Sequence, residues 1–453
     1  MSTTIPKQKI IIVGGGCFGL SSAYALSLKP EYEVWVYDRL PIPVPDAAST
    51  DVNKIVRADY GDDTLYMHLM FEAFPLWHQF NKEREALGQS PVFHQSGVLL
   101  LSSNGSYSPF EQASLKSIRE AGHGYAIEEF LTPESIVSRF PQFKGAVDRG
   151  YDIGYLNKEG GWCNSREAVV HMYNKCISQG VRFVTGSGQG EFGSLFCPES
   201  SRIVRGIVTK DGQVHLADRV LLATGAWSAG VVDMKKLVTA TGQAVVHFEP
   251  KGTMLNQFQS ADCPVWCGDL SRTGFYGFPA NAEGKMKVGI HNAGYLWPRE
   301  SDQVSVPRTQ VTHTDDTIPL NGLRQFRQFL GGFLPETSAL DITYSRLCWY
   351  SDAIDGQFVI DYHPDYENLI VATGDSGHGM KFIPNIGMHI RDVIEGRATD
   401  YTRRWAWRQL ETSETKLDGL RSGNEVKRGI IASEQEGMRL VELDELKASR
   451  PQL

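Results

Sequence analysis

The chain lacks three features that would assign it to broad classes of protein. No apolar run approaches the roughly 20 residues that a membrane-spanning helix needs, and the first residues, MSTTIPKQKIIIVGGG, lead into a strand pattern and not into a signal peptide. The 45 Lys and Arg are outnumbered by 53 Asp and Glu and form no basic cluster interleaved with aromatic residues. We therefore expect an intracellular protein, cytoplasmic or peroxisomal, with neither nucleic acid nor a membrane as partner. The last residues, SRPQL, are not a peroxisomal signal of the S-K-L type and leave the compartment open.

Cysteine is scarce and shows no pairing pattern. The seven cysteines are an odd number and widely scattered, and the one close pair, Cys263 and Cys267, stands alone. This usage argues against a disulfide framework and a zinc site, so we expect reduced thiols and no metal. Taken alone, each cysteine is by default a small buried apolar residue. That default also applies to Cys348, in the stretch RLCWYSD.

The N-terminal residues contain a strand, a glycine-rich turn, a helix and a second strand in close succession. Residues 9–13 are a β-branched run typical of a buried parallel strand, and residues 14–19 follow the pattern G-x-G-x-x-G. Residues 20–26 then indicate a helix, and residues 33–38 indicate a second strand.

Each glycine of this unit has a physical role, and so does the acid at the end of the second strand. Gly14 makes the tight turn, Gly16 lets the backbone approach a pyrophosphate, and Gly19 lets the helix pack on the strand. Asp38, 24 positions after Gly14, can bind ribose hydroxyls. The unit predicts dinucleotide binding, although it does not by itself separate NAD from FAD.

The chain later returns twice to a strand that ends in a glycine elbow. After a hairpin turn at Asp211-Gly212, the strand 219–223 leads into Thr224-Gly225-Ala226. The strand 369–372 leads into a glycine-rich turn and a helix expected to begin near Pro384. Three such elbows suggest one sheet edge that faces one long cofactor.

These motifs resemble the monomeric sarcosine oxidase family of flavoproteins, with the fungal pipecolate oxidase, saccharopine oxidase and fructosyl amino acid oxidase (amadoriase) groups as relatives. The resemblance runs from about residue 9 to about residue 395, and it rests on the glycine motif and on NKIVRADYG, GGW, ATGAWS, FYGFP, KVGIH, LCWYSD and ATGDSGHGMKFIPNIG. It implies an α/β protein in which an FAD-binding Rossmann-type domain is interleaved with an α+β substrate-binding domain, a two-domain architecture of the glucose-methanol-choline and D-amino acid oxidase type. The implied ranges are 1–95, 156–235 and 345–400 for the FAD-binding domain, 96–155 and 236–344 for the substrate-binding domain, and 401–453 for a C-terminal surface segment.

The resemblance also implies that Cys348 holds FAD covalently, through a thioether to the 8-methyl carbon of the flavin. A thiolate can attack that electron-poor carbon, and the tether prevents loss of the cofactor. Backbone N–H groups in residues 375–381, ahead of a helix, would stabilise the charge that develops on the N1/C2 carbonyl edge during reduction. The residues expected to bind FAD are Gly14, Gly16, Cys17, Phe18, Gly19, Asp38, Arg39, Ser49, Thr50, Cys348, Asp375, Gly377, His378, Gly379, Met380 and Lys381.

Three basic residues are implied to bind the substrate. Arg57 in NKIVRADYG and Lys381 in GHGMKF match the two cations that hold the substrate carboxylate in sarcosine oxidase. A guanidinium fork and an ammonium that converge on one carboxylate make a physically sensible clamp. Lys54 matches another basic position and stands at helical i, i+3 spacing from Arg57.

Lys287, Tyr276 and His291 are the implied catalytic residues. Lys287 in KVGIH matches the lysine that activates dioxygen beside the flavin, because a fixed cation lowers the barrier to forming superoxide. Lys285, two positions earlier on the same strand face, is expected to face solvent. Tyr276 in FYGFP and His291 match positions near the substrate nitrogen.

The resulting hypothesis is an FAD-dependent oxidase of an N-substituted or cyclic amino acid, such as sarcosine, pipecolate or saccharopine. Its partners would be that small substrate and dioxygen, with hydrogen peroxide and an imine as products, and we expect a monomer. In the resemblance, amadoriases have Glu at the place of His291 and lack an Arg at the place of Arg57, which favours a plain amino acid substrate here. The alternatives are an amadoriase, a biosynthetic N-methyl oxidase, and a non-catalytic flavin- or NAD-binding redox module.

Overall fold

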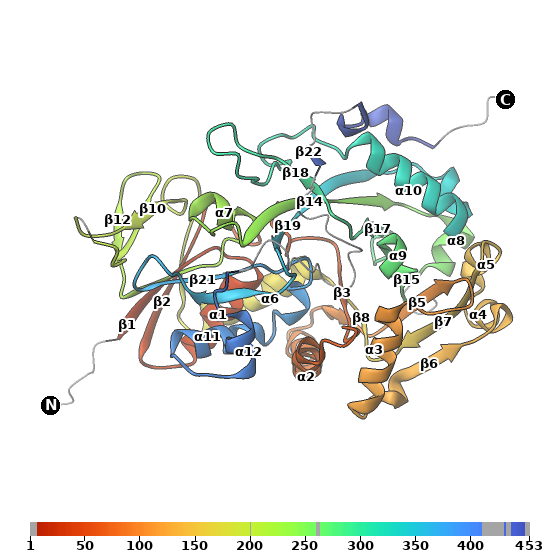
Figure 1. The fold of residues 1–453 in the computed structure, drawn as a ribbon, viewed down its shortest axis with the longest axis horizontal. Helices are drawn as coiled ribbons and strands as arrows, with labels where there is room; N and C mark the ends of the chain where they lie inside the picture. Colours follow the sequence, from red (N-terminus) through yellow and green to blue (C-terminus); the bar gives the residue numbers. More distant parts are fainter. Residues whose placement is uncertain (1–6, 200, 260–262, 410–429, 432–435, 449–453) are drawn as a thin grey trace.

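A computed structural model describes residues 7–199, 201–259, 263–409, 430–431 and 436–448. Two large sheets organise these residues (Figure 1). The strands that follow the N-terminus lie at the left of Figure 1, and the second sheet extends across the top and the right-hand side. The bounds of their strands and of the surrounding helices follow.

The first sheet is mostly parallel and holds the N-terminal strand at its centre. Its strands are β1 (Gln8–Val13), β2 (Tyr32–Asp38), β9 (Arg182–Thr185), β13 (Arg219–Leu222), β20 (Val359–Tyr362) and β21 (Leu369–Thr373). Their order is β20-β21-β13-β1-β2-β9, and only the edge strand β20 runs antiparallel to its neighbour. Ile10, Ile11 and Ile12 are fully buried, as expected for a parallel strand covered on both faces.

The second sheet is larger and mostly antiparallel. Its strands are β5 (Val98–Ser103), β6 (Ile127–Phe130), β7 (Tyr151–Asn157), β14 (Val238–Phe248), β15 (Val265–Gly268), β16 (Phe275–Gly277), β17 (Met286–Ile290), β18 (Tyr295–Leu296), β19 (Tyr344–Ala353) and β22 (Ile430–Ile431). The long strand β14 pairs with β17 and, from Val238 to His247, with β19. His247 of β14 lies opposite both Lys287 of β17 and Tyr344 of β19.

Two small sheets and a set of helices complete the described fold. The small sheets are formed by β3 (Lys54–Val56), β8 (Gly161–Cys163) and β4 (Phe93–His94), and by β10 (Phe192–Phe196), β11 (Gly206–Thr209) and β12 (Val214–Leu216). The helices are α1 (Cys17–Ser27), α2 (Thr64–Glu85), α3 (Pro109–Glu120), α4 (Pro133–Arg139), α5 (Lys144–Val147), α6 (Ser165–Ser178), α7 (Ser228–Val231), α8 (Gly252–Gln257), α9 (Leu270–Thr273), α10 (Leu320–Phe333), α11 (Ile386–Ile394) and α12 (Asp400–Trp405). Helix α1 packs against α6 and α11 beside the first sheet, and apolar side chains of α10 pack in the core of the second sheet.

The predicted α/β fold class is confirmed, and so is the unit formed by β1, α1 and β2. The hairpin at Asp211-Gly212 joins β11 to β12, and the two later strands of the first sheet end at the predicted glycine elbows. The helix expected near Pro384 begins at Ile386, with Asn385 as its N-cap.

Two further expectations differ from the structure. The i, i+3 spacing of Lys54 and Arg57 does not reflect a helix, because residues 54–56 form strand β3, which pairs with β8. Strand β19 crosses the boundary expected at residue 345, because its pairing with β14 places it in the second sheet.

The described part of the C-terminal segment contributes to the interior. Trp405 is fully buried in the core beside the first sheet, while Met438, Val441 and Leu446 are buried in the core of the second. These apolar side chains differ from the expectation of a purely surface segment. Residues 410–429, 432–435 and 449–453 lie outside the described residues.

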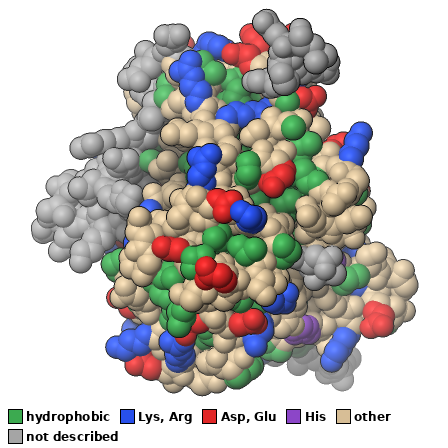
Figure 2. All heavy atoms as spheres, turned by 90° about the vertical axis from the view of Figure 1, so that its right-hand side faces the viewer, with side chains coloured by type: hydrophobic (Ala, Val, Ile, Leu, Met, Phe, Trp, Pro, Cys, Tyr) green, Lys and Arg blue, Asp and Glu red, His purple; other side chains and the backbone are tan. Residues whose placement is uncertain are grey.

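Three observations on the described residues concern bilayer-spanning helices, metal-binding groups and surface charge. No helix among them combines the length and the apolar character that crossing a bilayer requires. Within the same ranges, His, Cys, Asp and Glu side chains form no group of three or more that could hold a metal ion. On the face seen in Figure 2, basic and acidic side chains are interspersed and not gathered by sign.

Candidate active site

The glycine turn after β1 is built for close backbone approach. Gly14 has φ +109°, and a Cβ there would lie 2.3 Å from the carbonyl oxygen of Ala223 in the neighbouring elbow. A Cβ on Gly19 would lie 1.8 Å from the carbonyl oxygen of Gly14, so only glycine lets α1 approach β1 this closely. Asp38 accepts a hydrogen bond of 2.7 Å from the N–H of Gly15, while burial raises the pKa of its carboxyl group.

A cavity opens beside this turn, and we call it the glycine cavity. All three strand-to-glycine elbows contribute to its lining, through Gly14, Gly225 and Thr373, as the sequence predicted. The predicted cofactor residues that line it are Gly14, Gly16, Cys17, Phe18, Asp38, Arg39, Ser49, Asp375, Gly377, Gly379 and Met380. Gly16 faces this space, because a Cβ there would meet only the Ser49 hydroxyl at 3.4 Å. The turn, the acid and the cavity fit a dinucleotide whose pyrophosphate lies at the start of α1.

Cys348 lies in β19 between this cavity and a buried group of charges. Its side chain is buried beside Ala48 and Tyr350, which both line the glycine cavity. The Sγ of Cys348 lies 3.3 Å from the Nζ of Lys54, which lines the same cavity. An ammonium at this distance can stabilise negative charge on the sulfur.

A second cavity, which we call the cation pocket, holds the predicted carboxylate clamp. Arg57 and Lys381 both line it, and both are only 5% exposed. The guanidinium carbon of Arg57 and the Nζ of Lys381 lie 5.7 Å and 4.7 Å from the centre of the same ring, that of Tyr60. Two residues 324 positions apart in the sequence therefore bring their positive charges to the same aromatic ring of the pocket wall.

Asp59 is a buried acid beside the clamp, and its carboxylate already accepts hydrogen bonds from other residues. Arg57 donates to the carbonyl oxygen of Asp59, whose carboxylate accepts from the hydroxyl of Tyr155 at 2.8 Å and the amide of Asn157 at 3.2 Å. Burial raises the pKa of Asp59, although Arg57 opposes this. A partner of opposite charge in the open pocket would complement the two cations.

Tyr276 and His291 also line the cation pocket. Both line it together with Tyr350, whose ring centre is 5.9 Å from that of His291. Burial raises the pKa of Tyr276, which also hydrogen-bonds Tyr350. The Tyr276 ring lies directly over Gly289 of β17, where a Cβ would approach the phenol oxygen to 2.6 Å.

Lys287 lies deeper, in a buried group of charges that the sequence did not reveal. Its Nζ is fully buried and donates to the Asp51 carboxylate at 2.7 Å and to the carbonyl oxygen of Asn53 at 2.9 Å. The same Asp51 oxygen lies 3.2 Å from Lys54 and 3.2 Å from Arg346. We refer to Asp51, Lys54, Lys287 and Arg346 as the charge cluster.

Burial and mutual attraction act against each other in the charge cluster. Burial lowers the pKa of Lys287 to about 8, and the Asp51 carboxylate opposes this decrease. Burial would likewise lower the pKa of Lys54, but the Cys348 sulfur and Asp51 outweigh it and raise that pKa. Burial would raise the pKa of Asp51, yet its three cations hold that pKa well below the ordinary value.

A third, open cavity lies on the other side of the charge cluster, and we call it the rear cavity. It is lined by Asp51 and Arg346, and also by Thr50, Trp162 and His247, each of which has a buried side-chain polar atom without a partner among the described residues. Such atoms are normally satisfied by water, so this cavity is expected to be hydrated.

Three chain segments run from the rear cavity to the cation pocket and place the charge cluster between the two. One end of each segment lines the rear cavity, at Asp51, Lys285 and Arg346. The other end of the same segment lines the cation pocket, at Lys54, His291 and Tyr350 respectively. Lys287 is buried between Lys285 and His291 on the same strand face. Lys285, predicted to face solvent, is partly exposed, whereas Lys287 is fully buried.

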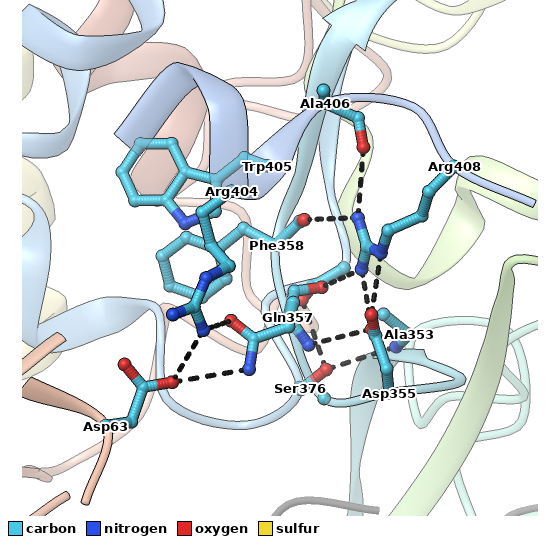
Figure 3. A network of polar contacts seen from close by, with 12 residues as sticks. Asp63, Ala353, Asp355, Gln357, Phe358, Ser376, Arg404, Trp405, Ala406 and Arg408 are labelled. Carbon is cyan, nitrogen blue, oxygen red and sulfur yellow. Dashed lines mark hydrogen bonds and ion pairs between the residues drawn. The ribbon is translucent and has the colours of Figure 1, made fainter. Parts of the chain in front are cut away.

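The outer wall of the cation pocket is tied to the C-terminal segment (Figure 3). Asp63 and Asp355 both line the pocket. Arg404 lies 3.1 Å from Asp63, and Arg408 makes two bonds of 2.5 and 2.6 Å to Asp355. The sequence offered no signal for these contacts, because the partners lie far apart along the chain.

Some predicted cofactor residues lie away from the glycine cavity. His378 and Lys381 line the cation pocket, and the ring nitrogens of His378 lie 3.1 Å from the Tyr60 hydroxyl and 3.2 Å from the carbonyl oxygen of Gly356. Thr50 lines the rear cavity instead of the glycine cavity. Lys54, predicted to bind substrate, lines both the glycine cavity and the cation pocket.

Comparisons with known proteins agree with this architecture. Residues 9–393 match the family model described as FAD dependent oxidoreductase. L-saccharopine oxidase of Schizosaccharomyces pombe is 29% identical over 435 residues, covering 92% of this chain and 97% of that protein. Monomeric sarcosine oxidase of a Bacillus species is 24% identical over 382 residues, covering 83% and 90%. A structure of fructosyl peptide oxidase from E. terrenum superimposes with a TM-score of 0.79 at 26% identity, covering 95% and 96%.

The chain therefore belongs to the family of FAD-dependent oxidoreductases. Its cofactor is FAD, for which the glycine cavity provides the turn, the acid and the space. The particular reaction depends on the cation pocket and the charge cluster beside it.

Proposed function

We propose that this protein is an FAD-dependent oxidase of a secondary amine that carries a carboxylate, such as an N-substituted or cyclic amino acid. The observation that supports this best is the pair of buried cations, Arg57 and Lys381, on the Tyr60 ring beside the glycine cavity. A carboxylate held there would place the adjacent carbon and nitrogen toward Tyr276 and His291. The resemblance of the chain to saccharopine and sarcosine oxidases over most of its length points to the same substrate class.

The residues of the cation pocket would divide the work between binding and orientation. Arg57 supplies a planar fork and Lys381 a point charge, so together they fix both the position and the rotation of a carboxylate. FAD, when bound, accepts a hydride from the carbon beside the amine and later gives its electrons to dioxygen. If the neutral amine binds, hydride loss leaves an iminium cation that water hydrolyses, so no strong base is required.

The second half of the reaction needs a positive charge and one proton. A hydride equivalent, one proton and dioxygen together make one hydrogen peroxide. Lys287 is proposed to provide the fixed positive charge for this step, because charge that develops in a dry site is stabilised best by a preorganised ion. Its burial and its two hydrogen bonds hold that charge in one place.

A covalent flavin is a further part of the proposal. In wild-type protein that is precipitated with acid, the yellow colour should remain in the pellet, because a thioether to Cys348 survives denaturation. The Cys348→Ala variant should release free FAD into the supernatant, whereas Cys267→Ala, which removes another buried cysteine, should not. Flavin that appears entirely in the wild-type supernatant would show that Cys348 holds no cofactor.

The substrate class can be tested with a peroxide assay over a panel of amines. Sarcosine, pipecolate, saccharopine, N-methyl amino acids and fructosyl valine sample the leading proposal and its amadoriase alternative. We expect peroxide with at least one of the first four and little with fructosyl valine, because His291 and Arg57 line the pocket. Turnover of fructosyl valine alone would favour the amadoriase, and no peroxide with any amine would favour a redox module without oxidase activity. Size-exclusion chromatography would test the expected monomer.

A further inference from the structure

Asp51 is the only acid of the charge cluster, and its contacts set it apart from an ordinary ion pair. One carboxylate oxygen, Oδ2, lies 2.7 Å from Lys287, 3.2 Å from Lys54 and 3.2 Å from Arg346. The other oxygen, Oδ1, accepts 2.8 Å from the N–H of Val52, which fixes the rotation of the group. The three cations come from β3, β17 and β19, so this carboxylate joins three separate strands.

We propose that Asp51 is the positioning residue that fixes the Lys287 ammonium and keeps it protonated at neutral pH. This inference rests on the proposed role of Lys287 in dioxygen reduction. Asp51 itself lines the rear cavity and not the cation pocket, so it acts through Lys287 and does not touch the substrate.

The position of the Lys287 ammonium depends on Asp51 because few other groups hold it. Among the described residues, its Nζ makes hydrogen bonds only to Asp51 and to the carbonyl oxygen of Asn53. Its Nζ also lies 5.2 Å from the ring centre of Phe278, which lines the cation pocket. The ammonium is therefore held at the back of the pocket wall. An ammonium has three N–H donors, and Asp51 and the carbonyl oxygen of Asn53 accept from two of them.

The charge state of Lys287 depends on all the groups that surround it. Burial lowers its pKa to about 8, Asp51 raises it, Lys54 lowers it and the Cys348 sulfur raises it. Arg346 is the remaining member of the cluster, and the titratable groups that interact with cluster members are His247 on β14, Cys163 on β8, Tyr276 on β16 and Tyr344 on β19. Burial lowers the pKa of His247 to about 4, so this side chain is neutral near pH 7 and does not replace Asp51.

The sign of the expected shift follows from these charges. Lysine is charged below its pKa, so at neutral pH Lys287 keeps its proton with only a small margin. Removing the negative charge of Asp51 would lower that pKa and increase the neutral fraction of Lys287 at pH 7. Removing the positive charge of Lys54 would raise the same pKa, which makes Lys54→Gln a matched control of opposite sign.

The first measurement is a direct titration of Lys287 by NMR in the intact holoenzyme labelled with [13Cε]lysine. The resonance that is missing in Lys287→Met identifies the residue. We expect wild-type Lys287 to titrate near pH 8, Asp51→Asn to titrate lower by about one pH unit or more, and Lys54→Gln to titrate higher. An Asp51→Asn titration at or above the wild-type value would overturn the proposal.

Asp51→Asn leaves three buried cations without a counter-charge, so it could fail to fold. The double variant Asp51→Asn with Arg346→Gln removes one of those cations and provides a second protein for the same titration. Arg346→Gln alone is the reference for the double variant, because loss of this cation by itself raises the pKa of Lys287. A titration of the double variant below that of Arg346→Gln supports the proposal, and an equal or higher titration contradicts it.

The second measurement is the pH dependence of flavin reoxidation by dioxygen in stopped flow. In the wild type the rate should fall as pH rises through about 8. In Asp51→Asn this fall should move to lower pH, while anaerobic reduction by substrate stays close to wild type. Asp51→Glu keeps the charge but moves the carboxylate, so its titration should stay near the wild-type value while its reoxidation slows.

The failure of this inference can be separated from the failure of the proposed function. If Lys287→Met reoxidises like the wild type, the proposed role of Lys287 is wrong, whatever Asp51 does. If Lys287→Met is slow while Asp51→Asn changes neither the NMR titration nor the pH dependence, only the positioning role of Asp51 is wrong.

Discussion

Replacing Lys287 by methionine is expected to slow the reoxidation of reduced flavin by dioxygen by roughly 10²- to 10⁴-fold. This corresponds to about 3 to 5 kcal/mol of barrier, the order expected when a preorganised charge beside a developing anion is lost. The side chain of Lys287 is fully buried, and methionine keeps its length and its apolar stem. Asp51 would keep Lys54 and Arg346 as partners, so the fold should persist. Stopped-flow reoxidation measures the effect, while anaerobic reduction and turnover with an artificial acceptor should largely persist.

Lys285→Met is the matched control for this prediction. Lys285 lies two positions earlier and lines the rear cavity, where it is partly exposed. Its replacement should change neither half-reaction by more than about twofold, because a solvated charge contributes little to a buried site. If Lys285 were the oxygen-sensitive residue, the arrangement of the charge cluster would not explain oxygen reactivity. If neither variant slowed flavin reoxidation by dioxygen, a dehydrogenase with another electron acceptor would become the better interpretation.

Replacing Arg57 by alanine is expected to lower kcat/KM for a carboxylate substrate. The expected loss of transition-state binding free energy is about 2 to 4 kcal/mol. That is the usual order when one partner of a buried charge pair is removed. Arg57 is almost completely buried, and Lys381 would remain as a single point charge without the planar fork. Steady-state kinetics with the best substrate of the amine panel measure the loss.

Two comparisons separate recognition of the carboxylate from general damage to the pocket. Arg57→Lys keeps a charge but loses the fork, so its kcat/KM should fall between those of the wild type and the alanine variant. An amine analogue without the carboxylate should lose little further activity in Arg57→Ala. An unchanged kcat/KM in Arg57→Ala would show that the cation pocket does not hold a carboxylate through this residue, and the amadoriase alternative would then regain weight.

The parts of the fold that were predictable from the sequence are those with short-range causes. Gly14 is required by its own positive φ and Gly19 by a contact within the same strand-to-helix turn, so their spacing and the acid Asp38 predict the dinucleotide site directly. The elbows after β13 and β21 were found in the same way. Their arrangement along one sheet edge follows because parallel strands end on the same side.

The charge cluster could not be predicted, because its meaning depends on long-range packing. Asp51 looks like an ordinary loop acid until β3, β17 and β19 bring three cations to it. Thr50, its neighbour, was expected at the cofactor but lines the rear cavity, since neighbouring loop residues need not face the same way. The spacing of Lys54 and Arg57 fits a helix, and pairing of β3 with β8 outweighs that local pattern.

The three segments that run from the rear cavity to the cation pocket have a consequence for how such a protein can change. Residues that shape the outer pocket, such as Asp63 and Asp355, are held by Arg404 and Arg408, while the charge cluster is held by Asp51 on the far side. Among the described residues no hydrogen bond or ion pair joins these two groups, so the effects of substitutions in them should be close to additive. Selection could therefore act separately on the preference for an amine substrate and on the preference for an electron acceptor. A lineage could change one of these two properties while it retains the other.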